Sequence, residues 1–338
     1  MKRFLLHILL YSITLFSIII SINEYCYKNA FLYWGETATY QNKLRYLLHP
    51  DKNTNTAIIG SSRIHHHVNP KIVDSLCAEQ DVFIRTINLG SGHQFPPKTI
   101  YLAQTIINQA EETKLKYLII ELNPFSITPA YLRKVPRFYY WVNIQQLFYW
   151  STKVIALKES VKFKFRSILN LIYLYGNQLS NIKLYQNVIA NSTPDITEPE
   201  HFISTDSLLR KNIQEGRWTT NHNPHAIYLK NLDNINFIPV IVGENDSTRV
   251  IQNLWQNLIT TAHKKNIQIF FMSRPAYTPR IAEKYFNPDQ LLNLNLDSFY
   301  FQAPYRFEEH HLNEAGATIF SQKLGETFCQ KISRKSTP

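Results

Sequence analysis

Short apolar runs that alternate with longer amphipathic stretches constrain the fold of this chain more than any other feature. Four runs have the length of buried strands and lie at residues 56–59, 82–89, 116–122 and 267–272. Three stretches have apolar residues at helical spacing and lie at residues 97–114, 247–265 and 314–332. Strands that alternate with helices form parallel sheets covered by helices. We therefore predict an α/β fold with a parallel sheet, in which polar residues at strand ends gather at one edge.

A long apolar segment places the chain at a membrane. Residues 4–22 contain no Asp, Glu, Lys or Arg, and Lys2 and Arg3 precede them. At about 1.5 Å per residue, a helix of this length spans roughly 28 Å, close to the hydrocarbon thickness of a bilayer. Basic residues before a span favour a cytoplasmic N-terminus. Residues 1–22 are therefore predicted to be a single-pass anchor in the cytoplasmic membrane, with the remaining residues extracytoplasmic, in the periplasm or at the cell surface.

A cleaved signal peptide is the alternative to an anchor. Its apolar region is usually about 7–15 residues long and ends at a small-residue site. The exit from the apolar segment, residues 21–26, has no A-x-A pattern, which favours an uncleaved anchor. Residues 23–55 are polar and aromatic and are interpreted as a stalk, leading to an α/β domain at residues 56–334.

Residues 126–240 interrupt the alternation and are predicted to be an insertion in this domain. Residues 137–175 are dense in aromatic side chains and lysines, at a spacing that indicates helices. One interpretation is a lid or a membrane-facing subdomain, because basic and aromatic surfaces suit lipid headgroups. The other is an ordinary helical insertion that packs its aromatic side chains inward.

The chain is basic, with a formal net charge of +11 and a pI of about 9.4. This charge favours anionic partners such as phospholipid headgroups or acidic glycans. No nucleic-acid motif is present, so no nucleic-acid partner is predicted. Three cysteines without C-x-x-C spacing do not indicate a metal site, but they are compatible with one disulfide outside the cell.

A run of three histidines, His65 to His67, suggests a metal site at first sight. Adjacent histidines on a helix point in different directions and cannot easily share one ion. We therefore predict no metal and no other cofactor. His65 or His67 could instead contact a substrate, because both follow a serine turn.

That turn, Gly60-Ser61-Ser62-Arg63, is the first of two motifs that carry chemistry. A strand should end and a helix begin there, which presents a hydroxyl near backbone N–H groups that favour negative charge. A serine becomes a nucleophile only beside a general base. A serine at this place is also a common helix cap, so the motif alone does not distinguish the two roles.

The second motif, Glu308-Glu309-His310-His311, precedes the last predicted helix. A carboxylate three residues before a histidine can meet its ring across a tight turn. The carboxylate of Glu308 would then hold one ring nitrogen of His311, while the other nitrogen takes a serine proton.

Together these motifs resemble the SGNH-hydrolase (GDSL-like) superfamily. The resemblance is closest to its extracytoplasmic, membrane-anchored branch, which includes the alginate O-acetylation proteins and the D-alanyl transfer protein of teichoic acids. That family has a flavodoxin-like three-layer α/β/α sandwich. It carries G-[DS]-S after the first strand, Gly after the second, Asn after the third and D-x-x-H before the final helix.

The resemblance implies a role for each matching residue. Ser62 would be the nucleophile and His311 the base. The N–H groups of Ser62 and Gly90, with the side chain of Asn123, would bind the oxyanion. Glu308 stands where the family has Asp, and Glu309 could serve in its place.

The resemblance also implies an activity. We expect a serine-dependent acyl-ester hydrolase or O-acyltransferase, with acetyl as the favoured acyl group, that acts on cell-envelope or exported glycan through an acyl-Ser62 intermediate. A transferase would take its acyl group from a membrane-bound donor protein. Arg63 and Arg274 are candidate substrate contacts, because each follows a predicted strand. Two alternatives stay open: a non-catalytic SGNH-like module that binds glycan or a partner in an envelope assembly complex, and a lipid esterase that uses the insertion to contact the membrane.

Overall fold

The chain divides into two compact units, of which one combines residues 1–45 with 127–197 and the other combines residues 46–126 with 198–338. The computed structural model describes residues 1–30, 46–48, 53–123 (without 93, 95, 111 and 112), 141–180 (without 158), 246–273, 286–294, 303–305 and 311–336. Much of the predicted insertion at residues 126–240 lies outside the described residues.

Five parallel strands form the sheet of the larger unit, in the order β2-β1-β3-β4-β5. The strands are β1 (Thr56–Ile59), β2 (Thr86–Asn88), β3 (Tyr117–Leu122), β4 (Gln268–Ser273) and β5 (Leu291–Leu292). Their apolar side chains are almost completely buried, which is typical of parallel strands with helices on both faces. The predicted α/β fold with a parallel sheet is confirmed.

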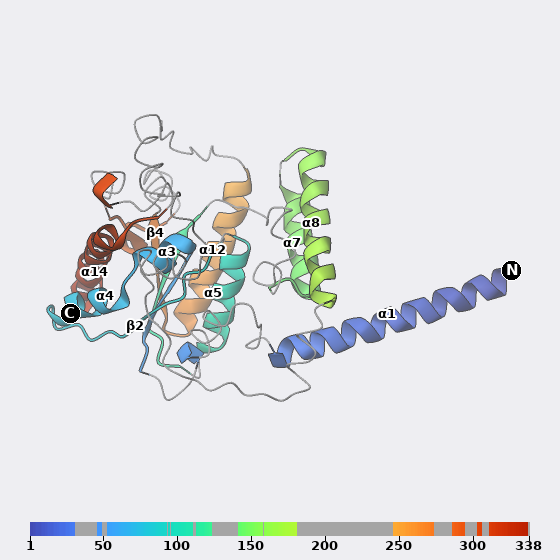
Figure 1. Cartoon of the computed structure of the whole chain (residues 1–338), viewed down its shortest axis with the longest axis horizontal. Helices are drawn as coiled ribbons and strands as arrows, with labels where there is room; N and C mark the ends of the chain where they lie inside the picture. Colours follow the sequence, from blue (N-terminus) through green and yellow to red (C-terminus); the bar gives the residue numbers. More distant parts are fainter. Residues whose placement is uncertain are drawn as a thin grey trace, which may run out of the picture. The chain divides into compact units, whose positions relative to one another are not determined.

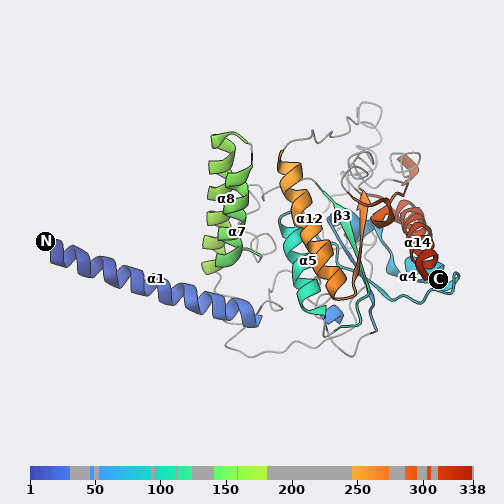
Figure 2. The same ribbon diagram turned by 180° about the vertical axis from the view of Figure 1, so that it is seen from behind.

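Four helices pack in pairs beside this sheet. Helix α4 (Pro70–Ala78) contacts α14 (Glu314–Ser336), and α5 (Lys98–Asn108) contacts α12 (Asp246–Lys264). The two pairs lie on opposite sides of the strands (Figures 1 and 2). A short helix, α3 (Ser62–His67), follows β1 directly, and two 3-10 turns, η4 (Pro288–Gln290) and η5 (Ala303–Tyr305), come before β5 and α14.

Strand β2 is shorter than the predicted run at residues 82–89. Before β2, the side chain of Asn55 takes the place of a neighbouring strand: its amide donates to the Phe83 carbonyl at 3.2 Å and accepts the Arg85 N–H at 2.9 Å. Helix α4 and strand β5 are additional elements that apolar spacing did not predict. β5 has only two residues, too few to form a periodic pattern.

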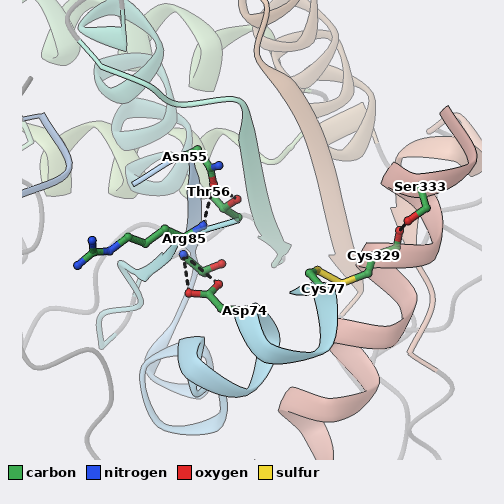
Figure 3. The surroundings of a disulfide bond; sticks show 8 residues. Asn55, Thr56, Asp74, Cys77, Arg85, Cys329 and Ser333 are labelled. Carbon is green, nitrogen blue, oxygen red and sulfur yellow. Dashed lines mark hydrogen bonds between the residues drawn. A yellow bond between two sulfur atoms is a disulfide. The ribbon is translucent and has the colours of Figure 1, made fainter. Parts of the chain in front are cut away.

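A disulfide between Cys77 and Cys329 joins α4 to α14 (Figure 3). It belongs to a buried core cluster in which the rings of Phe270 and Phe328 meet edge to face, with centroids 5.2 Å apart. The Tyr117 ring packs on Phe328 in the same way, at 5.5 Å. The cross-link and the aromatic cluster hold α14 against the sheet, and α14 is the helix that His311 precedes.

The carboxyl ends of β1, β2 and β3 meet at one edge of the sheet, because β1 lies between the other two and all three are parallel. The Ser91 N–H donates to the Gly60 carbonyl at 3.0 Å, which joins the turns after β1 and β2. Asn123 follows β3 at this edge. The polar strand-end residues are therefore brought together as the alternation predicts.

The smaller unit contains α1 (Lys2–Ala30), α7 (Ile144–Ala156) and α8 (Val161–Leu179). Within α1, Lys2–Cys26 is long and apolar enough to cross a membrane, a property that a signal sequence shares. The helix continues to Ala30, so the predicted stalk at residues 23–55 begins as a helix. α7 and α8 lie in the region where the spacing at residues 137–175 predicts helices.

Candidate active site

The turn after β1 gives its two serines different roles. Ser61 has extended backbone angles and is the N-cap of α3, because its Oγ accepts the Arg63 N–H at 3.3 Å. It is buried. Ser62 is the first residue of α3 and is only half-buried. The capping role that a serine commonly has at this position is therefore filled by Ser61, which leaves the Ser62 hydroxyl available for chemistry.

The hydroxyl of Ser62 meets the imidazole of His311. Ser62 Oγ lies 2.9 Å from His311 Nε2, although 249 positions separate the two residues in sequence. His311 is also half-buried and stands just before α14. This is the distance at which a general base can remove the proton of a serine nucleophile. The structure thus brings together the two residues predicted to be nucleophile and base.

A second histidine, His67, ties the far end of α3 to the same loop. Its Nε2 accepts the backbone N–H of Leu312, the residue after His311, at 3.0 Å. An acceptor nitrogen carries no proton, so the proton of this neutral imidazole is on Nδ1. Ser321 of α14 strengthens the junction, since its Oγ accepts the Asn69 N–H at 2.8 Å and lies 3.1 Å from the His67 carbonyl oxygen.

His67 therefore joins α3 to the residue after His311, and its side chain is not placed to contact a substrate. Its side chain is completely buried, which excludes the direct contact with substrate considered for it from the sequence. Because α3 starts at Ser62 and ends at His67, the bond to Leu312 fixes both ends of one short rigid element relative to His311. No sequence pattern could have indicated this role, since the bond joins positions 245 residues apart.

Asn88, the last residue of β2, holds α3 from the other side. Its Nδ2 donates to the carbonyl oxygens of Ile64 at 2.7 Å and Val68 at 2.8 Å, and its Oδ1 accepts the Gly90 N–H at 2.8 Å. The side chain is completely buried. Both amide hydrogens are used. The Val68 carbonyl at the end of α3 gains a partner that the helix itself does not supply, and the Ile64 carbonyl, which already accepts the Val68 N–H, gains a second donor.

Gly90 approaches α3 so closely that only glycine fits. A Cβ on Gly90 would collide with the backbone N of His65 and come within 2.8 Å of its Cα. The N–H of Gly90, which the resemblance assigns to the oxyanion, donates to Asn88 Oδ1 in this structure. Gly90 thus contributes to the packing of α3, and it can serve an oxyanion only if that N–H changes partner.

Glu121 of β3 is a functional candidate that the sequence reasoning missed. Its Oε2 accepts the Ser61 N–H at 2.6 Å and an amide hydrogen of Asn123 at 2.8 Å, and both side chains are buried. The shared acceptor places the Asn123 amide beside the serine turn. A carboxylate inside the otherwise apolar run at residues 117–122 is a sequence signal that could have identified Glu121, because buried charges need specific partners.

Asn123 has capacity left for a ligand. One of its two amide hydrogens goes to Glu121, which leaves the second. Its Oδ1 is buried and has no hydrogen-bond partner among the described residues. Buried polar groups are normally satisfied, so an Asn with open capacity that shares the Glu121 carboxylate with the serine turn fits a residue that binds a reacting group.

Several predicted site residues are not placed. Glu308, Glu309 and Arg274 lie outside the described residues, as does His310. Arg63 is half-buried, and its guanidinium makes no hydrogen bond or ion pair within the described part of the chain. The acid of a catalytic triad is therefore not identified by the structure.

His66 packs on His311, and His65 packs in turn on His66. The ring of His66 meets that of His311 edge to face, with centroids 5.2 Å apart, and His65 meets His66 at 4.6 Å. Among the described residues no group of three or more His, Cys, Asp or Glu side chains could hold a metal ion. The arrangement is one of aromatic rings that meet edge to face beside a serine–histidine pair.

No protein-family model, curated protein or solved structure matches this chain. A functional interpretation therefore depends on the geometry of the site and on the motifs that form it.

Proposed function

We propose that the protein is a serine-dependent acyl-ester hydrolase or O-acyltransferase of the SGNH type, anchored in the cytoplasmic membrane with its α/β domain outside. The observation that carries this proposal is the 2.9 Å contact between Ser62 Oγ and His311 Nε2 at the carboxyl edge of a parallel sheet. Ligand sites in open α/β sheets lie at that edge. A hydroxyl within reach of a base is the minimal nucleophile for acyl transfer.

The reaction would proceed in two acyl transfers. His311 Nε2 takes the Ser62 proton as Oγ attacks the acyl carbonyl, and the tetrahedral intermediate collapses to acyl-Ser62 while the imidazolium returns the proton to the leaving alcohol. Water or a sugar hydroxyl then attacks acyl-Ser62, with His311 again removing the proton. The choice between these acceptors decides whether the enzyme is a hydrolase or a transferase.

The oxyanion would be stabilised by groups at the three strand ends. As the first residue of α3, Ser62 has no helical acceptor for its own N–H. Asn123 offers its second amide hydrogen, and Gly90 offers an N–H that must first leave Asn88. One oxyanion donor is typically worth about 2.7–4 kcal/mol of barrier.

The order of motifs along the sheet supports the SGNH assignment. Gly60-Ser61-Ser62 follows β1, Gly90 follows β2, Asn123 follows β3, and His311 precedes the final helix. The strand order 2-1-3-4-5 is that of flavodoxin-like sheets. A three-layer α/β/α sandwich of that type is the architecture we infer for the domain.

The location outside the cytoplasm is supported by two features. Lys2 and Arg3 precede the apolar segment of α1, which favours a cytoplasmic N-terminus. The disulfide between Cys77 and Cys329 suits an oxidising compartment such as the periplasm or the cell surface. A glycan of the envelope or in export is the acyl acceptor or ester substrate that such a location offers, and acetyl is the group we favour.

A second candidate function is a non-catalytic SGNH-like module that binds glycan or a protein partner. The engagement of the Gly90 N–H by Asn88 favours it, because the oxyanion site is then short of one donor. In that case the Ser62–His311 contact would only join α3 to the loop before α14.

A serine-reactive fluorophosphonate probe separates these functions. We expect the probe to label the full-length, detergent-solubilised protein, because only an activated serine reacts. Labelling should inhibit the hydrolysis of p-nitrophenyl acetate by the protein to the same extent. Ser62→Ala and His311→Ala should abolish both labelling and hydrolysis. Ser61→Ala and Ser91→Ala are matched controls at the same edge of the sheet and should keep labelling. Labelling that persists in Ser62→Ala would overturn the assignment of the nucleophile.

A further inference from the structure

Helix α8 has two apolar faces, of which one is buried and the other is exposed in the part of the chain that the structure describes. Its buried side includes Leu171 and Leu174. Its other side presents an apolar stripe formed by side chains that are 46–83% exposed: Val161, Phe165, Leu169 and Ile172. Residues spaced by four, four and three positions share one face of a helix. A large apolar stripe that the protein leaves uncovered is typical of an interaction surface.

Helix α7 repeats this pattern. Phe148 and Ile155, seven positions apart and hence on one face, are 66% and 58% exposed, whereas Trp150 and Val154 are buried. α7 and α8 pack against each other and lie side by side in Figures 1 and 2. The two helices thus form a helical hairpin, and each of them keeps apolar side chains away from their mutual contact.

The charged side chains of the two helices are all basic, and the short connection between α7 and α8 contains one acidic residue, Glu159. α7 and α8 contain no Asp or Glu, while α8 carries Lys162, Lys164 and Arg166 and α7 carries Lys153. Lys162 and Arg166 are exposed and lie beside the apolar stripe, since successive residues turn by about 100° around a helix. An apolar face bordered by Lys and Arg, with aromatic side chains, is the pattern of a helix that lies in a membrane interface.

The hairpin is attached to α1 where the apolar segment ends. From residue 4 to residue 22 the large apolar side chains of α1 are exposed, apart from the half-buried Ile20, and the first buried side chain after them is Asn23. Asn23 Nδ2 donates to the Gln178 carbonyl of α8 at 3.4 Å, and the Glu24 carboxylate accepts the Ile144 N–H at the start of α7 at 3.0 Å. Polar bonds thus join both helices of the hairpin to α1 one and two residues after the uncharged apolar segment at residues 4–22 ends.

We propose that α7 and α8 lie on the membrane that α1 crosses, with the apolar stripe of α8 inserted at the boundary between headgroups and acyl chains. Lys162 and Arg166 would contact the headgroups of anionic lipids, which attract basic segments close to the surface. The partner is the bilayer itself, because the hairpin is held at the level where α1 leaves the hydrocarbon. This inference rests on α1 as a membrane span and is independent of the Ser62 chemistry.

A pair of phenylalanines on α8 provides a matched test. Phe165 belongs to the apolar stripe, whereas Phe163, which is 40% exposed, lies two positions earlier and so on the far side of the helix. Each is replaced by a single labelling cysteine, Phe165→Cys or Phe163→Cys, in the full chain carrying Cys26→Ser and the intact Cys77–Cys329 disulfide. The protein is reconstituted into vesicles of phosphatidylcholine and phosphatidylglycerol, and an environment-sensitive fluorophore is attached.

Lipids that carry a nitroxide close to the headgroup then quench a fluorophore that lies at the membrane interface, and so report its depth. We expect the label at position 165 to be quenched several-fold more by these lipids than by aqueous iodide, and the label at position 163 to show the reverse. Ile172→Cys, on the stripe, replaces Phe165→Cys if that variant does not fold. Equal lipid quenching at positions 163 and 165 would overturn the proposal. So would protection of position 165 from both quenchers, because a second protein chain would then cover the stripe.

Discussion

Replacing Asn88 with alanine tests how β2 holds the helix that begins at Ser62. The wild-type amide makes three buried hydrogen bonds, to the carbonyls of Ile64 and Val68 and from the N–H of Gly90. In Asn88→Ala all three are lost. The Ile64 carbonyl still accepts the Val68 N–H at 3.2 Å, so two groups, the Val68 carbonyl and the Gly90 N–H, lose their partner.

Each buried polar group left without a partner costs about 1–3 kcal/mol. Two such groups predict a loss of about 2–6 kcal/mol in the free energy of unfolding of the α/β unit. For a unit of this size, Tm falls by about 2–4 °C per kcal/mol. Hydrolytic activity should fall as well, because α3 loses one of the contacts that hold its carboxyl end, and Ser62 is its first residue.

Thermal unfolding followed by tryptophan fluorescence measures the change, on the full-length protein in detergent. Asn53→Ala is the matched control, since the Asn53 side chain makes one exposed bond with Lys114 and its loss should change the unfolding free energy by less than about 1 kcal/mol. A loss below about 1 kcal/mol in Asn88→Ala, equal to that of the control, would refute the reasoning.

Three further substitutions have expected outcomes. Gly90→Ala should destabilise the fold by at least about 1–3 kcal/mol, because the added Cβ meets the His65 backbone. A Cβ added at Gly92 would meet no atom within 4 Å, so Gly92→Ala should be near neutral. Equal Tm values for the two variants would contradict this. His67→Phe keeps a buried ring but leaves the Leu312 N–H without its acceptor, so we expect a free energy of unfolding about 1–3 kcal/mol lower and a lower kcat. His67→Gln should restore part of both losses. An unchanged kcat in His67→Phe would show that His67 does not position His311. Loss of the disulfide in Cys77→Ala should cost about 2–5 kcal/mol, and the denatured, unreduced wild type should expose one thiol, that of Cys26; three reactive thiols in the exported protein would refute the cross-link.

The sequence predicts the sheet and the central pair of residues because both depend on local patterns. Four apolar runs indicate β1 to β4, and the positions of Ser62 and His311 follow from a strand end and a helix start. Parallel pairing then brings the strand ends to one edge without any knowledge of side-chain contacts. The strand β5 and the true length of β2 could not be predicted in this way. The two residues of β5 are too few to show a periodic pattern, and the side chain of Asn55 replaces a neighbouring strand beside residues 83–85.

The supporting residues of the site could not be predicted in the same way. His67, Asn88 and Glu121 act through bonds to backbone atoms of other elements, and such bonds leave no spacing in the sequence. The histidine run suggested a substrate contact for His67, but tertiary packing buries the ring beneath the loop of His311. Glu121 is a carboxylate in an apolar strand, and Asn88 is an amide at a strand end. Both are unusual enough to indicate that they have specific partners, but which residues these partners are can be seen only in the folded structure.

The most direct test of the Ser62–His311 pair is to trap its covalent intermediate. The full-length protein is mixed with p-nitrophenyl acetate, quenched in acid within the first turnover and digested, and the peptides are analysed by mass spectrometry. Acetylation of Ser62 in the wild type, lost in His311→Ala, is the predicted result. An acetyl group on Ser61 or another residue, or the same Ser62 adduct in His311→Ala, would contradict activation of Ser62 by His311.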